Sequence, residues 1–252
     1  MIGGATEETA RSSGDLATFS MFDGNHLGVL VVTVVIAVAL CRWARPRTEG
    51  DDAVRRVAIV LALVQLANQV IWHSRMILND AWTLQESLPL HLCDAAVMVT
   101  VLALWRPRPW LFELCYFWSL VGALQALITP DIEDGPGSYF FWQFFITHSG
   151  LVIAGTYLAF GEGLTPRRGC VWRVWIATNL WALLAATANV AFDANYMFLS
   201  EPPPTGSLLD AFGEWPWYIL VCEFLAVGMI ALLSLPFRSR RAASPEPGTP
   251  VR

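Results

Sequence analysis

Seven apolar runs follow one another along the chain, separated by short polar connections. They cover residues 26–44, 55–78, 87–105, 110–129, 139–160, 170–192 and 215–237. A helix needs about 20 consecutive, mostly apolar residues to cross the hydrocarbon core of a bilayer. The pattern therefore predicts an all-α polytopic membrane protein, with seven transmembrane helices bundled into one domain, residues 26–237.

The composition agrees with this pattern and narrows the class. The 252 residues are 55% hydrophobic and 15% charged, whereas soluble globular domains carry about 25% charged residues. The chain contains no lysine, so all 16 basic residues are arginine. A Schiff base cannot form without lysine, which excludes a seven-helix retinal protein and lysine-dependent catalysis.

Charged residues in the connections alternate in sign along the chain. The arginine-rich connections hold Arg42, Arg45, Arg47, Arg55 and Arg56, then Arg106 and Arg108, then Arg167, Arg168 and Arg173, then Arg238, Arg240 and Arg241. The acidic connections hold Asp80 and Glu86, then Asp131, Glu133 and Asp134, then Glu201, Asp210 and Glu214. Arginine-rich loops stay in the cytoplasm. We therefore expect a cell-membrane protein with its N-terminus outside and its C-terminus inside.

Both ends of the chain are polar. Residues 1–25 are acidic and lack the basic start of a signal peptide, so we expect an uncleaved extracytoplasmic segment. Residues 238–252 include the stretch ASPEPGTP, a composition typical of disorder. This stretch predicts a disordered cytoplasmic tail.

Polar side chains interrupt the apolar runs, where each one needs a partner or a function. Gln65, Asn68 and Gln69 share a face of the second run, His73 lies close to them, and Gln143 lies in the fifth run. Two interpretations stay open for the amides. They form hydrogen bonds between helices, or they line a cavity and bind a substrate.

The stretch LPLHLCD, residues 88–94, places a histidine, a cysteine and an aspartate together inside the third run. Pro89 marks a helix start, so Cys93 lies near the positive end of the helix dipole, which favours a thiolate. His148 in the fifth run is a candidate general base for this thiol. His91 and Asp94 share a helical face, and they either orient a base or pair with each other.

Depth decides whether Cys93 and His148 can meet. At about 1.5 Å per residue, Cys93 lies roughly 7 Å and His148 roughly 13 Å below the outer start of its run. Helical side chains tilt outward in both runs, so the imidazole rises toward the thiol. Contact requires that the third and fifth helices are neighbours, which periodicity does not establish. Structural hydrogen bonding is the alternative role for both residues.

Several stretches together resemble the YwaF-like family of bacterial seven-span membrane proteins. They are LPLHLCD, QALITPDI, FFITHSGLVIAGTYL, and NYMFL followed by PPPTGSLLDAFGEWPWY, and they extend over about residues 88–218. The family includes animal relatives proposed as lysophospholipid acyltransferases. In those relatives a cysteine of the HLC motif and a fifth-span histidine are implicated in acyl transfer, and these positions match Cys93 and His148.

The resemblance implies a membrane-embedded enzyme whose cysteine takes an acyl group from a membrane lipid. A lysophospholipid or water then receives that group. On this interpretation the catalytic residues are Cys93, His148, His91 and Asp94, and the amides of Gln65, Asn68, Gln69 and Gln143 contact the substrate. We expect no cofactor, no metal and no nucleic-acid partner. The segment before Trp215 matches the family pattern but has no known role.

Two other classes of protein compete with this hypothesis. A zinc-dependent lipid hydrolase would use His73, His91, His148 and Asp94, although none of the four histidines is paired at HxxxH spacing. A non-enzymatic transporter, channel or lipid-binding protein would use intramembrane carboxylates such as Glu223, Asp193 and Asp94. Glu113, near the inner end of the fourth run, can reach water and is given no role.

Overall fold

The computed structural model describes residues 18–47, 51–203 and 208–238, and all its named elements are helices. Six helical segments are long and apolar enough to cross a membrane. They are α2 (Gly24–Ala44), α3 (Asp52–Leu78), α5–η1–α6 (Pro109–Trp118, Ser119–Ala123, Leu124–Ile128), α7–η2 (Tyr139–Thr156, Tyr157–Gly161), α8 (Cys170–Phe192) and α9–η5 (Trp217–Ser234, Leu235–Phe237). The all-α membrane class is confirmed, with six of the seven predicted spans. The predicted tail and most of the predicted N-terminal segment lie outside the described residues.

The third predicted span is shorter than expected. Helix α4 covers Leu92–Trp105, 14 residues, which is about 21 Å against a hydrocarbon thickness of about 30 Å. The expectation that the helix starts near Pro89 is wrong: α4 starts at Leu92, and main-chain groups of Leu88 and Leu90 bond to side chains distant in sequence. Leu88 N donates to Tyr196 Oη at 2.9 Å, and Trp181 Nε1 donates to Leu90 O at 3.1 Å. A seventh crossing by α4 stays a prediction.

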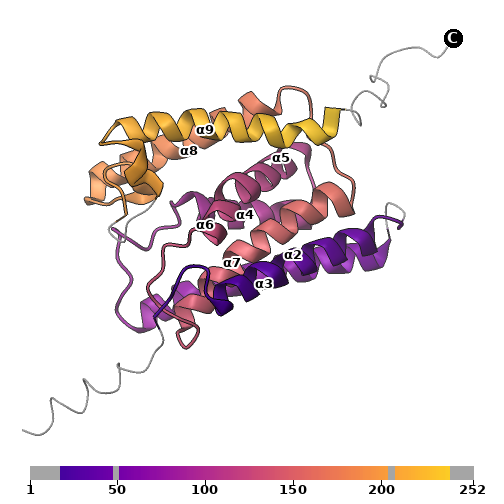
Figure 1. The fold of residues 1–252 in the computed structure, drawn as a ribbon, viewed down its shortest axis with the longest axis horizontal. Helices are drawn as coiled ribbons and strands as arrows, with labels where there is room; N and C mark the ends of the chain where they lie inside the picture. Colours follow the sequence, from indigo (N-terminus) through magenta and orange to yellow (C-terminus); the bar gives the residue numbers. More distant parts are fainter. Residues whose placement is uncertain (1–17, 48–50, 204–207, 239–252) are drawn as a thin grey trace, which may run out of the picture.

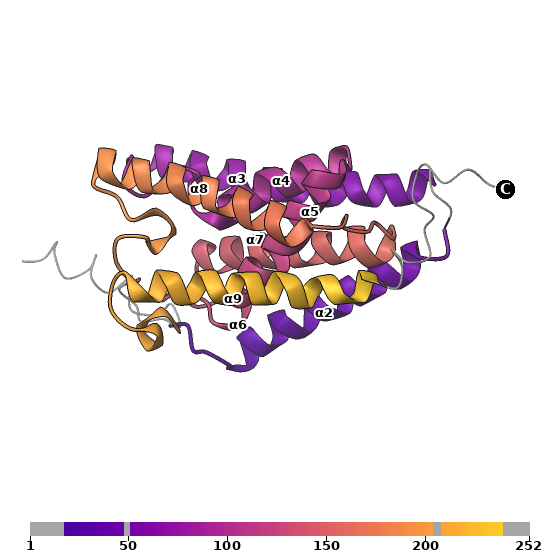
Figure 2. The same cartoon turned by 90° about the horizontal axis from the view of Figure 1, so that it is seen from above.

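Helices α4, α5 and α7 contact one another and hold most of the buried side chains at the centre of the bundle, with α2 and α3 packed on the outside against α7. Helices α8 and α9 lie side by side along one flank (Figures 1 and 2). Two short 3-10 helices, η3 (Tyr196–Phe198) and η4 (Leu208–Phe212), lie in the connection between α8 and α9. Fully buried side chains such as Phe117, Leu151 and Tyr157 fill the central core.

The segment η1 is a π-helical turn between α5 and α6, and it packs against α7. Gly155 of α7 allows this close approach: a Cβ at Gly155 would lie 3.1 Å from Cβ of Ser119. Single π-helical turns inside α-helices often occur near functional sites. Here the turn lies against the same helix that carries His148.

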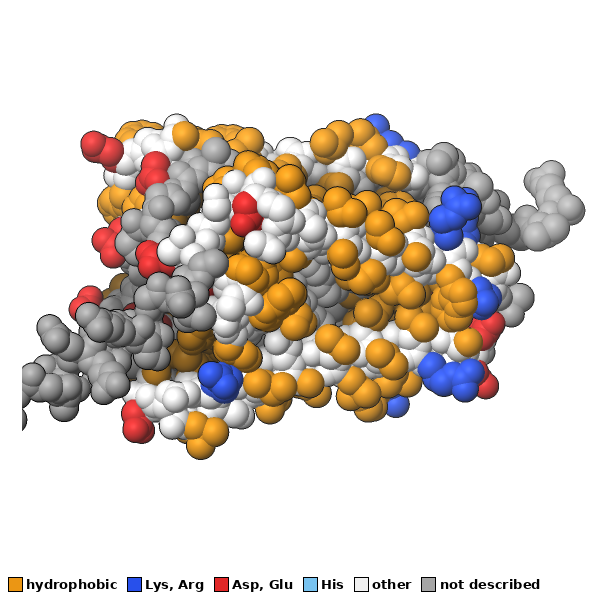
Figure 3. Space-filling model, turned by 60° about the horizontal axis from the view of Figure 1, so that its bottom comes forward, with side chains coloured by type: hydrophobic (Ala, Val, Ile, Leu, Met, Phe, Trp, Pro, Cys, Tyr) orange, Lys and Arg blue, Asp and Glu red, His pale blue; other side chains and the backbone are white. Residues whose placement is uncertain are grey.

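The outer surface of the bundle suits lipid. Val190 and Phe224 are 90% and 80% exposed. Exposing such apolar side chains is unfavourable in water but not in the hydrocarbon of a membrane. Acidic side chains gather at one end of the molecule and most arginines at the other (Figure 3). Arg75, which the sequence partition did not include, lies in the last turn of α3 and covers the ring of Tyr139 at 4.3 Å. The inside or outside assignment of the two ends stays a prediction.

Candidate functional site

Cys93 and His148 lie on helices α4 and α7, which pack directly against each other. Thr100 Oγ1 of α4 donates to Cys115 Sγ at 3.3 Å, and a Cβ at Gly155 of α7 would lie 3.5 Å from Cys115 O. Cys93 and His148 each lie seven residues before these contacts, toward the N-terminus of their helix, which is two helical turns or about 10 Å. The two side chains therefore lie at a similar depth and on the same helical faces as the residues that meet at Cys115.

His148 is buried and its protonation pattern can be assigned from its partner. Its Nδ1 lies 2.8 Å from the main-chain oxygen of Phe144, and its ring packs at a tilt against the Phe144 ring, with centroids 4.1 Å apart. A carbonyl oxygen only accepts, so Nδ1 carries the proton and Nε2 has a lone pair. A neutral histidine with a basic Nε2 is what a general base requires.

Cys93 is the second residue of α4 and is partly buried. His91, the N-cap residue, makes no side-chain hydrogen bond to the first turn. The backbone N–H groups of this first turn lie beside the thiol, and so does the carboxylate of Asp94 in the same turn. The neighbouring Leu92 packs on the π-turn, where a Cβ at Gly122 would lie 3.8 Å from its side chain.

The side chains of His91 and Asp94 bond to different partners. Gln69 Nε2 donates to Asp94 Oδ1 at 3.1 Å, and the same amide lies 3.3 Å from His73 Nε2. Met197 N donates to His91 Nδ1 at 3.3 Å. Of the two predicted arrangements, pairing between His91 and Asp94 alone is wrong. Each residue instead faces protein, in a separate contact.

The amides of the second span form hydrogen bonds between α3 and α7. Gln65 Nε2 donates to Thr147 O at 2.9 Å. Asn68 Nδ2 donates to Gln143 O at 3.1 Å and to Thr147 Oγ1 at 2.7 Å, and Gln143 Nε2 donates to the same hydroxyl at 3.3 Å. The bonds of Gln65 and Asn68 match the interhelical interpretation, whereas the Gln143 side chain bonds within α7. A substrate-binding role for the four predicted amides stays a prediction, and of them Gln69 is the one bonded to Asp94.

The geometry favours neither rival class. Among the residues the structure describes, no three His, Cys, Asp or Glu side chains gather as a metal-ligating group. Glu223 is held between α8 and α9, because Trp175 Nε1 donates to its Oε2 at 2.5 Å and Asn179 Nδ2 donates to it at 3.1 Å. This intramembrane carboxylate therefore joins two helices.

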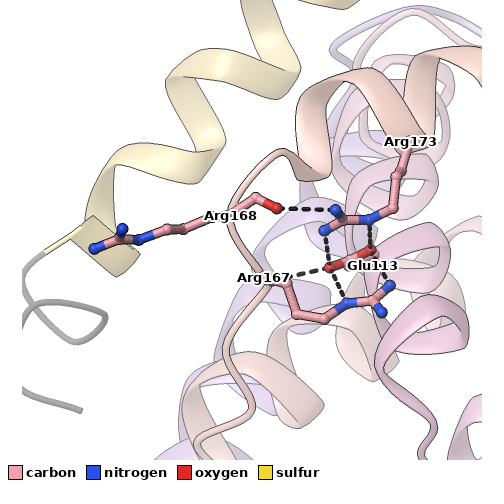
Figure 4. A network of polar contacts seen from close by, with 4 residues as sticks. All are labelled: Glu113, Arg167, Arg168 and Arg173. Carbon is pink, nitrogen blue, oxygen red and sulfur yellow. Dashed lines mark hydrogen bonds and ion pairs between the residues drawn. The ribbon is translucent and has the colours of Figure 1, made fainter. Parts of the chain in front are cut away.

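Glu113 is a buried residue whose role the sequence did not reveal. Only 1% of it is exposed, so the expectation that it reaches water is wrong. Arg167 and Arg173 each donate two side-chain hydrogen bonds to its carboxylate, at 2.8–3.0 Å (Figure 4). A buried charge needs a partner of opposite charge. The arginines in the connection before α8 could therefore have indicated this cluster from the sequence. It ties α5 to α8 at the end of the bundle opposite Cys93.

The apolar surface and the long helices define a multi-pass helical membrane protein. Residues 21–234 match the TMEM164 family, so the chain belongs to that family. It is also similar to an uncharacterized protein of Treponema pallidum (strain Nichols), with 26% identity over 231 residues, 89% of this chain and 92% of the relative. No solved structure matches the chain. The resemblance to the YwaF-like family stays a prediction.

Proposed function

We propose that this protein transfers acyl groups between membrane lipids through a thioester on Cys93, with His148 as general base. The observation that carries the proposal is the hydrogen bond between His148 Nδ1 and Phe144 O. That bond leaves Nε2 basic, on a helix that packs against α4 with Cys93 at a similar depth. The substrates are a phospholipid acyl donor and a lysophospholipid or water acceptor, and the protein resides in the cell membrane.

The first half of the reaction forms the thioester. His148 Nε2 takes the thiol proton of Cys93, and the sulfur attacks the carbonyl carbon of a lipid ester. The ester C–O bond breaks, and the departing lysolipid oxygen receives the proton from His148. The positive end of the α4 dipole stabilises the thiolate while it exists.

The second half reverses these roles. The hydroxyl of the acceptor gives its proton to His148 Nε2 and attacks the thioester carbonyl. The C–S bond breaks, and the thiolate regains the proton from His148. Asp94 and the amide of Gln69 lie beside Cys93 along α4 and α3, where they help to orient the lipid.

Intact-protein mass spectrometry tests the thioester. The purified protein is incubated with phospholipid vesicles, and we expect an acyl adduct that hydroxylamine removes. Cys93→Ala should abolish the adduct, whereas Cys222→Ala, the matched control in another span, should retain it. An adduct that persists in Cys93→Ala, or no adduct on the unmodified chain, contradicts the proposal.

A further inference from the structure

The turn Asn195–Phe198 follows α8 and belongs to the NYMFL stretch, for which the proposed reaction provides no role. Three residues that are not glycine have positive φ in or beside it: Asp193 at 54°, Met197 at 59° and Phe198 at 53°. Such backbone conformations cost of order 1–3 kcal/mol each and persist where surrounding contacts impose them. The contacts that hold this turn therefore identify what it supports.

The side chain of Asn189 in α8 holds the turn in place through two hydrogen bonds to its main chain. This buried side chain accepts a hydrogen bond from Tyr196 N at 2.7 Å and donates to Tyr196 O at 3.1 Å. The hydroxyl of Tyr196 donates to Leu84 O at 2.8 Å and accepts from Leu88 N at 2.9 Å. The turn is therefore fastened to α8 on one side and to the segment that precedes α4 on the other.

The turn contacts His91 in two ways. The rings of Tyr196 and Phe198 pack on the imidazole, with centroids 5.3 and 5.6 Å away. Met197 N donates to His91 Nδ1 at 3.3 Å. A nitrogen that accepts carries no proton, so neutral His91 carries its proton on Nε2.

His91 and His148 therefore hold opposite tautomers. His148 presents a basic Nε2, whereas His91 presents an Nε2–H that can only donate. Burial lowers the pKa of His91, and the nearby carboxylate of Asp131 partly opposes this shift, so the neutral donor form is retained near neutral pH. His91 is the N-cap residue of α4, two positions before Cys93 and on the outer side of the thiol.

We propose that His91 Nε2–H donates a hydrogen bond to the carbonyl oxygen of the acyl group that Cys93 attacks, and that Asn189, Tyr196 and Met197 position this donor. The inference rests on the proposed acyl transfer, and it assigns a role to the NYMFL stretch. Negative charge develops on that oxygen when sulfur adds to the carbonyl carbon, and an oriented donor stabilises it. The function of the strained turn Asn195–Phe198 would then be to hold the Nε2–H donor of His91 in position.

Two reagents that react with Cys93 distinguish a residue that donates a hydrogen bond to the acyl carbonyl from a residue that acts as general base. Acylation by p-nitrophenyl palmitate passes through a tetrahedral oxyanion, whereas alkylation by N-dodecyl iodoacetamide does not. We expect His91→Ala to slow acylation by about 10²-fold, the usual effect of losing one oxyanion donor, with alkylation nearly unchanged. His148→Ala should slow both reactions, because both need the thiolate. Alkylation of Cys222 in the same molecule corrects for probe delivery.

Two more variants distinguish positioning from folding. His91→Gln keeps an N–H near the place of Nε2 and no basic nitrogen, so it should retain most of the acylation rate that His91→Ala loses. Asn189→Ala should reproduce the selective loss of acylation more weakly, because it releases the turn. Equal loss of both reactions in His91→Ala, or unchanged acylation, overturns this inference and leaves the Cys93 proposal intact. If Cys93 of the unmodified protein does not acylate, both proposals fail.

Discussion

At the scale of single residues, Glu113 shows how a charge is tolerated within an apolar helix. Its carboxylate is bound by Arg167 and Arg173, whose side chains are 47% and 41% exposed. Glu113→Gln should lower the free energy of unfolding by about 1–2 kcal/mol, because charge-assisted hydrogen bonds are lost while both arginines still reach water. Thermal unfolding in detergent micelles measures the change. Glu162→Gln, outside the cluster, is the control and should have a smaller effect.

His91 makes stability depend on pH. Its pKa in the folded protein lies below the ordinary value of 6.5, mainly because burial disfavours the charged form. As pH falls through 6.5, the unfolded chain takes up a proton at this residue before the folded protein does, so stability decreases on acidification. We expect the melting temperature to fall between pH 7.5 and pH 5, and to fall less in His91→Gln. An identical pH dependence in both proteins would contradict this assignment.

Residue chemistry was partly readable from the sequence. Cys93 and His148 stood out because polar groups are costly inside apolar runs, and the structure places them on neighbouring helices. The tautomers of His91 and His148 were not readable, since they depend on the main-chain groups of Met197 and Phe144. The first of these partners is more than 100 residues distant in sequence, so no local pattern contains it.

At the scale of helices, the contact between α7 and the π-turn η1 depends on the absence of a side chain at Gly155. Gly155→Ala should lower the free energy of unfolding by about 1–3 kcal/mol, because a methyl group 3.1 Å from Cβ of Ser119 forces the helices apart. It should also slow alkylation of Cys93, since His148 moves with α7. Thermal unfolding and labelling rates test this pair of effects.

Gly28→Ala in α2 is the matched control, because a Cβ there meets nothing within 4 Å. We expect no loss of stability and no change in labelling. Alanine favours a helix more than glycine does, so an equal loss of stability at both positions would show that packing against η1 does not cause the change.

The sequence pattern predicted the helix positions well, except at the start of α4, where hydrogen bonds to distant residues replace helical ones. Predicted and observed bounds differ by up to three residues in the six long spans, because apolar composition and length determine them. The start of α4 differs by five residues. The side chains of Tyr196 and Trp181 bond to the main chain of Leu88 and Leu90, and such distant partners leave no signal in local hydropathy.

At the scale of the whole molecule, topology depends on whether α4 crosses the membrane. Single cysteines at Glu86 and Arg108 flank this helix. In a chain without native cysteines, we expect an impermeant maleimide to label Glu86→Cys on intact cells and Arg108→Cys only after permeabilisation. Labelling of both from one side would mean that α4 does not cross. Labelling with the sides exchanged would reverse the predicted orientation.

The shortness of α4 has a consequence for the bilayer around it. A helix about 21 Å long leaves about 9 Å of a typical hydrocarbon core unmatched, and a membrane responds to such a mismatch by thinning locally. Lipids beside α4 would then sit with their ester groups closer to the midplane. A lipid could bring its ester to the depth of Cys93 without leaving its leaflet. We therefore expect acylation of Cys93 to be faster in vesicles of short-chain phospholipids than in thick, long-chain vesicles. The protein would select its substrate partly through the depth at which the membrane delivers it.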